Sequence, residues 1–167
     1  MAKGVMSVDV DARSYRNTVK LLNQLPKDVQ EQVRVHAQDI AIMMKQELEH
    51  QARTSPTPQA RLVAKSMKTP KDRFPKVTIG GPLKVGRPYK SRGGGRKRAP
   101  AGALLWGSEH GSRGGTDRRG RNYTRRYVAG HNDKGYWIAP ALKRVLPIAR
   151  DEYEKIINSV IGRASDG

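Results

Sequence analysis

Apolar residues recur at spacings of three and four between residues 27 and 53, which is the pattern of a helix with one buried face. Pro26 precedes this stretch, and the acidic residues Asp28 and Glu31 near its start would complement a helix dipole. The sequence therefore predicts a long N-terminal helix over residues 27–53. Its predicted core or subunit-packing side chains include Ile40, Met44 and Leu48.

A second stretch with the same spacing, over residues 136–161, predicts a short aromatic strand followed by a C-terminal helix. Pro140 suits the first turn of that helix, where backbone amides have no helical partner in any case. Pro147 predicts a kink or a helix start near it, because proline removes a backbone hydrogen bond. The apolar face would pack against the first helix, and its predicted packing residues are Trp137, Ile138, Leu142 and Val145.

Two shorter apolar elements are predicted between these helices. Val77 and Ile79 alternate with polar neighbours within residues 76–82, which indicates a strand that ends at two glycines and a proline. Residues 103–106 form a continuous apolar run and predict a short buried element. Its last residue, Trp106, is a further predicted packing residue.

The order of these elements predicts the fold class. One or two more strands are expected over residues 127–138, around a turn at residues 132–135. We therefore expect a single α+β domain over residues 1–167, with a small, mostly antiparallel sheet packed against a long N-terminal helix and a C-terminal helix. Long basic loops are expected over residues 84–100 and 112–130.

The positive charge of the chain is concentrated in its middle. The 167 residues carry a formal net charge of +18. Residues 1–59 hold eight Lys and Arg against seven Asp and Glu, residues 60–130 hold nineteen against three, and residues 131–167 hold six against five. The excesses are +1, +16 and +1, so a nearly neutral scaffold carries strongly basic loops. Such loops favour an anionic partner, either nucleic acid or an acidic protein face.

The two basic loops are rich in glycine and arginine, and tyrosines are interspersed among the cations. This composition suits contacts with phosphates and stacking on bases, and arginine favours planar, two-pronged contacts. The residues predicted to contact DNA or an acidic partner are Arg92, Arg96, Lys97, Arg98, Arg118, Arg119, Arg121, Arg125 and Arg126.

The sequence gives little support to enzymatic, metal or membrane functions. The chain has no cysteine, its four histidines have no compact metal-ligand spacing, and no phosphate-binding loop precedes a helix. His131 and Asp133 could suggest a nuclease-type cluster, but a turn explains them more simply. No apolar run is long enough to span a bilayer. We expect no cofactor, no metal, no catalytic residues and no membrane partner.

Four short segments in a fixed order resemble a known protein family. They are ARLVAKSM (60–67), VTIGGP (77–82), LLWGSEHGS (104–112) and YWIAPAL (136–142). This series resembles the tail-component or neck-protein family of long-tailed double-stranded DNA bacteriophages, the gene-product-ten type of head-to-tail connector. The matching residues are Leu62, Ser66, Met67, Val77, Ile79, Gly80, Glu109, Gly111, Ser112, Trp137, Ile138, Pro140, Ala141 and Leu142. The sequence departs from the family pattern at residues 58–60, at His110 and in the length of its basic segments.

The resemblance implies a non-enzymatic virion protein for head-to-tail connection or tail completion. It would form a homo-oligomeric ring in the neck, through which DNA passes, after assembly in the host cytoplasm. Its expected partners are a portal-side adaptor or stopper, a tail terminator and double-stranded DNA. A lean domain with large polar loops would gain burial from neighbouring copies in a closed ring. The alternative is a free-standing, basic nucleic-acid-binding protein.

Overall fold

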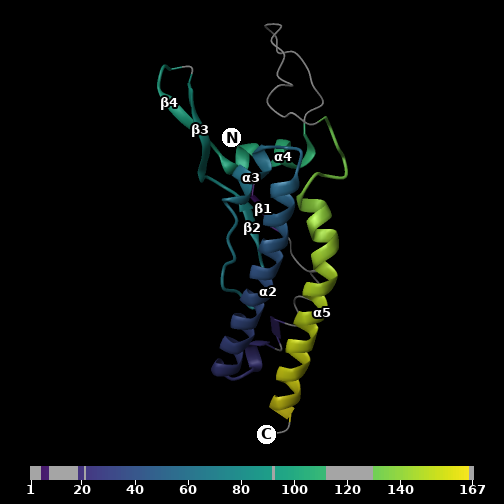
Figure 1. Cartoon of the computed structure of the whole chain (residues 1–167). Coiled ribbons are helices and arrows are strands. Elements are labelled where there is room, and N and C mark those ends of the chain that lie inside the picture. Colours follow the sequence, from purple (N-terminus) through teal and green to yellow (C-terminus); the bar gives the residue numbers. More distant parts are fainter. Residues whose placement is uncertain (1–4, 8–18, 21, 92, 112–129, 166–167) are drawn as a thin grey trace.

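Two long antiparallel helices form most of the body of the protein (Figure 1). The computed structural model describes residues 5–7, 19–20, 22–91, 93–111 and 130–165. Helix α2 spans Lys27–Thr54 and helix α5 spans Ile138–Ser165. The α+β class is confirmed, and so is the predicted N-terminal helix, which ends one residue beyond the predicted boundary.

The apolar stripes of α2 and α5 meet in the main core. Ile40, Met44 and Leu48 of α2 are buried, as are Ile138 and Val145 of α5. Leu142 is half-buried and packs against the edge of this core, whereas Trp137, immediately before α5, is fully buried. The burial of Ile40, Met44, Leu48, Ile138 and Val145 agrees with the predicted core faces of the two helices, because helical periodicity places these residues on the facing sides.

Shorter elements cover one end of the helix pair. Helix α3 (Gln59–Ala64) and helix α4 (Ala101–His110) pack against each other and against strand β2 (Thr78–Gly80). The Thr57 hydroxyl donates a hydrogen bond of 2.6 Å to the Ser108 carbonyl and joins the end of α4 to the turn before α3. These elements extend the core formed by α2 and α5.

The strands of the described residues form two separate two-stranded antiparallel sheets. Strand β1 (Val5–Ser7) pairs with β2 through Val5 opposite Gly80, and this confirms a strand within the predicted 76–82 segment. Val77 and Ile79 are buried, as their alternation predicts. The second sheet consists of β3 (Lys84–Lys90) and β4 (Arg96–Pro100).

The second sheet corrects the prediction of a loop over residues 84–100. These residues form a β-hairpin, which projects away from the two long helices as a thin ribbon (Figure 1). The prediction rested on the absence of a packed core, but a ribbon requires only backbone pairing and a turn. Residues 112–129 of the second predicted loop lie outside the described residues.

The segment before α5 also differs from its prediction. Residues 130–137 contain turns and bends but no strand, and residues 127–129 lie outside the described part. The backbone amides of Tyr136 and Trp137 bond to Glu109 instead of to a neighbouring strand. Pro140 lies in the first turn of α5, as predicted, and Pro147 lies inside a helix that runs from Ile138 to Ser165, so no helix starts at Pro147.

Candidate nucleic-acid interface

The β3–β4 ribbon is attached firmly at its base. The Ala101 amide donates to the Leu83 carbonyl at 2.8 Å, and the Gly102 amide donates to the Gly81 carbonyl at 3.0 Å. Val85, at the start of β3, is buried in the core. The ribbon is therefore held to α4 and to the end of β2 at the point where it leaves the body.

A turn at the far end reverses the chain between the two strands. The Ser91 amide donates to the Gly95 carbonyl at 2.8 Å, and the Gly94 amide donates to the Ser91 carbonyl at 3.0 Å. Gly94 has a φ of 82°, which residues with a side chain rarely adopt. The run of glycines that suggested a loop therefore has a specific role in closing the hairpin.

The basic side chains of the ribbon are exposed. Arg96, Lys97 and Arg98, which the sequence predicted as contact residues, form the exposed part of β4. Lys84, Arg87 and Lys90 add three exposed cations on β3, and sequence reasoning did not include them. Two strand-length segments on either side of a glycine run were the signal that could have identified them.

The remaining predicted contact residues lie outside the described part of the chain. They are Arg92, Arg118, Arg119, Arg121, Arg125 and Arg126. The structure therefore brings Arg96, Lys97 and Arg98 together on one ribbon and does not place the others.

The cations of the ribbon have no acidic partners in the part of the chain that the structure describes, where no ion pair involves any of the six. The sequence contains no acidic residue between Asp72 and Glu109. Because unpaired like charges repel one another, this surface is electrostatically suited to an external anion.

Glu109 is a structural residue whose role the sequence did not predict. The residue is 3% exposed, and its carboxylate accepts hydrogen bonds from the backbone amides of Ile138 at 2.8 Å, Ala139 at 2.9 Å and Trp137 at 3.2 Å. These amides lie at the start of α5, where a helix leaves its first N–H groups without internal partners. The Glu109 carboxylate therefore caps α5 from a different helix, and its charge complements the helix dipole.

Gly135 leaves the space that this carboxylate occupies. A Cβ atom built at Gly135 would lie 1.9 Å from Oε1 of Glu109, and the residue has a φ of +76°. Both the close approach and the backbone conformation require glycine. The turn before α5 is thus built around the Glu109 side chain.

Two described residues on either side of residues 112–129, His110 and Asn132, contact each other beside this cap. The Asn132 amide donates to the His110 carbonyl at 2.9 Å, and Nδ1 of His110 donates to the Asn132 carbonyl at 2.9 Å. The ring of His131 lies 6.4 Å from that of His110 and bonds to Asp133. Among the described residues, no group of three or more His, Cys, Asp or Glu could hold a metal ion.

Trp106 is not part of the core, contrary to its prediction as a buried residue. It is 68% exposed and packs against the ring of His110, with a centroid separation of 4.2 Å. Residues 103–106 were expected to be buried together, but a helix cannot bury four consecutive side chains on one face. Leu104 and Leu105 of α4 face inward, whereas Trp106 faces solvent.

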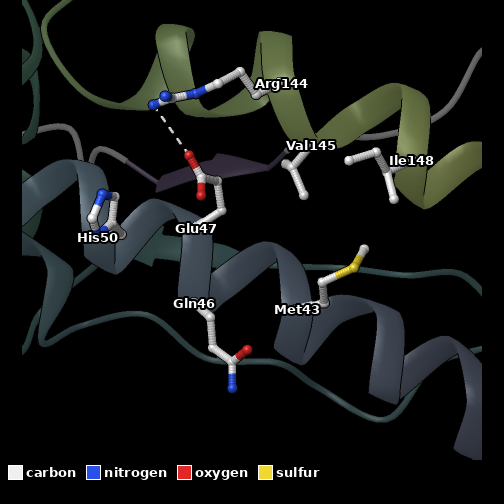
Figure 2. Close-up of a pocket in the computed structure, with 7 residues that line it drawn as sticks. All are labelled: Met43, Gln46, Glu47, His50, Arg144, Val145 and Ile148. Atoms are coloured by element: carbon white, nitrogen blue, oxygen red, sulfur yellow. Dashed lines mark ion pairs between the residues drawn. The ribbon is translucent and has the colours of Figure 1, made fainter.

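A pocket of about 520 Å³ lies between α2 and α5 (Figure 2). Met43 of α2 and Ile148 of α5 point toward each other across it, while Gln46 points away. Nη2 of Arg144 and Oε1 of Glu47 are 3.1 Å apart and form an ion pair between the helices. The seven lining residues are Met43, Gln46, Glu47, His50, Arg144, Val145 and Ile148.

Comparisons with known proteins found no relative. No protein-family model, no curated protein and no solved structure matches the chain. Among the described residues, no helix is long and apolar enough to cross a membrane.

Proposed function

We propose that the protein is a non-enzymatic virion subunit of a long-tailed double-stranded DNA phage. It assembles into a homo-oligomeric ring in the neck, between the head and the tail, and DNA passes through the ring. Its neighbours in the virion are a portal-side adaptor or stopper and a tail terminator.

The observation that carries this proposal is the way in which the four segments of the family resemblance fit together. The Gly80 amide donates to the Ser66 hydroxyl at 2.8 Å, which joins the first segment to the second. The Ile138 amide donates to the Glu109 carboxylate, which joins the third to the fourth. Helix α4 also packs against α3 and β2, so all four segments form one structural unit. Contacts between the segments are expected if they form one functional unit, as the resemblance implies.

The surface of the two long helices supports assembly into a ring. Ile148, at the edge of the α2–α5 pocket, is 53% exposed. A neighbouring copy that covered the pocket would remove Ile148 and Met43 from water, and burial of apolar surface drives association. A closed ring would cover this pocket on every copy.

The second candidate function is a free-standing nucleic-acid-binding module, which the unpaired cations of the ribbon favour. A free-standing module would bind nucleic acid tightly as a monomer, with a steep dependence on salt concentration. The neck subunit would instead act as a ring and would be present in phage particles.

Analytical ultracentrifugation over a range of concentrations and negative-stain microscopy of the purified protein would test the proposal. We expect a closed ring at high concentration, and detection of the chain in virions by mass spectrometry. A protein that stays monomeric at high concentration and is absent from particles would refute the proposal.

A pair of variants tests whether the α2–α5 pocket is the contact between copies. Ile148→Asp places a charge at the edge of the pocket, and Val35→Asp places the same charge at a similarly exposed position outside it. We expect Ile148→Asp to remain folded and monomeric, while Val35→Asp still forms rings. Rings formed by Ile148→Asp would show that the copies meet elsewhere, and monomers from both variants would show that the pocket is not the specific contact.

A further inference from the structure

The two faces of the β3–β4 ribbon carry different side chains. The register pairs Val85 with Ala99 and Tyr89 with Lys97. Successive residues of a strand point to opposite faces, so Lys97 and Ala99 of β4 share a face. One face of the ribbon therefore carries Val85, Ala99, Tyr89 and Lys97, and it continues into the core through the buried Val85.

The opposite face carries cations. The register pairs Lys90 with Arg96 and Lys84 with Pro100, and the alternation places Arg98 on the same side. All four cations of this face are exposed, and none has an acidic partner in the described residues. We refer to Lys84, Lys90, Arg96 and Arg98 as the cationic face.

We propose that the cationic face binds the phosphates of duplex DNA, whereas the Tyr89 and Lys97 face does not. This inference rests on the proposed function only in taking DNA as the partner. The inference specifies the residues that contact DNA and the face of the ribbon on which they lie.

The composition of the face favours nucleic acid over an acidic protein. The centres of protein–protein interfaces are depleted in charged residues, whereas interfaces with DNA are strongly positive. Apart from Pro100, the residues that the register places on this face are all Lys or Arg. Such a surface has no apolar centre on which a protein partner could pack.

The spacing of the face also suits a phosphate backbone. Arg96 and Arg98 are two residues apart, which corresponds to about 6.8 Å along a strand. Successive phosphates on one strand of a duplex rise by about 3.4 Å along the helix axis and also rotate about it, so neighbouring phosphates are separated by roughly twice that rise. The two arginines can therefore contact neighbouring phosphates. The contacts would be independent of base sequence, because phosphates carry no sequence information.

Lys90 and Lys97 form a matched pair for the experiment. Both are exposed lysines next to the turn of the ribbon, and they point to opposite faces. The full-length protein and the variants Lys90→Ser and Lys97→Ser are titrated against a fluorescein-labelled DNA duplex by fluorescence anisotropy at several salt concentrations. The slope of log affinity against log salt counts the phosphates that are neutralised.

We expect Lys90→Ser to reduce the magnitude of that slope by about 0.9 and Lys97→Ser to leave it unchanged. The triple variant Lys90→Ser, Arg96→Ser, Arg98→Ser should reduce it by about 2.7. Equal effects of Lys90→Ser and Lys97→Ser would overturn the inference, because they would indicate a general effect of net charge. Equally tight binding to a duplex RNA, or equally effective competition by polyglutamate, would overturn the choice of DNA.

Ultracentrifugation of the same samples separates this inference from the proposed function. Rings that do not bind duplex DNA at low salt would overturn the role of the ribbon and leave the neck subunit intact. Monomers that bind DNA through Lys90 but form no ring at any concentration would uphold the inference and overturn the ring.

Discussion

Charged residues on the two long helices and charged residues on the ribbon have different surroundings. Several cations of α2 and α5 form ion pairs, such as Arg144 with Glu47, and Arg150 with Glu154 at 2.7 Å. These pairs balance the charge of the helical body. The cations of the ribbon have no such partners within the described residues, so their charge is available to an external molecule. The body is thus suited to stability and the ribbon to binding, and substitutions should separate these two properties.

The largest effect is expected from a charge placed in the core. Ile40→Asp buries a carboxylate without a partner at a position that is 6% exposed and should lower the free energy of unfolding by at least about 4 kcal/mol. Ile42→Asp is the control, because Ile42 lies on the same helix and is 40% exposed. Urea denaturation followed by circular dichroism measures both variants. Similar losses in the two would contradict the described orientation of α2.

A smaller loss is expected at the Glu109 cap. Gly135→Ala places a methyl group against the carboxylate and puts alanine in an unfavourable backbone conformation. We therefore expect the free energy of unfolding to fall by about 2–4 kcal/mol. Gly130→Ala is the matched control, since a Cβ atom there meets nothing within 4 Å. Thermal unfolding of both variants would test this prediction. An unchanged melting temperature for Gly135→Ala would show that Glu109 does not occupy this turn.

The ribbon should tolerate the loss of its charges. Replacement of Arg96, Lys97 and Arg98 by serine should change the free energy of unfolding by less than about 0.5 kcal/mol, because all three side chains are exposed. The same variant should bind duplex DNA more weakly. A large fall in stability would mean that these residues pack in the folded protein, and the contrast between body and ribbon would fail.

The smallest effect on stability is expected from removing the charge of Glu31, which is paired at the surface. A hydrogen bond from Lys71 lowers the pKa of the Glu31 carboxyl below its ordinary value. The Glu31 carboxyl therefore binds a proton more tightly in the unfolded chain than in the folded protein. The ion pair stabilises the fold at pH values above the pKa of Glu31 in the unfolded chain, and this contribution is lost as the pH falls through its pKa in the folded protein. Glu31→Gln should lower the melting temperature slightly at neutral pH and not at all in strong acid. A difference that persists in strong acid would assign the effect to packing.

The sequence predicted those parts of the fold that follow from local periodicity. Ile40, Met44 and Leu48 could be assigned to the core because helical spacing alone places them on one face. The ribbon was not predicted, because its pairing depends on a register that the glycine-rich sequence does not display. Trp106 was assigned to the core from its hydrophobicity, although the period of α4 turns it outward.

The Glu109 cap could not be predicted for a different reason. The carboxylate and the Ile138 amide that it binds are 29 residues apart in the sequence, and no local pattern links an acidic residue to a distant helix start. Gly135 indicates a turn in the sequence, but the sequence does not show that glycine is needed there because the Glu109 carboxylate lies beside it. For the candidate site, composition identified the basic segment, while the strand register was needed to separate its faces.

The direct continuation of β4 into α4 has a mechanical consequence. Strand β4 ends at Pro100, α4 begins at Ala101, and Glu109 at the far end of that helix holds the start of α5. A force that pulls on the ribbon would therefore be transmitted through α4 to α5, which packs against α2. The load would be borne by the whole helical body and not by a hinge.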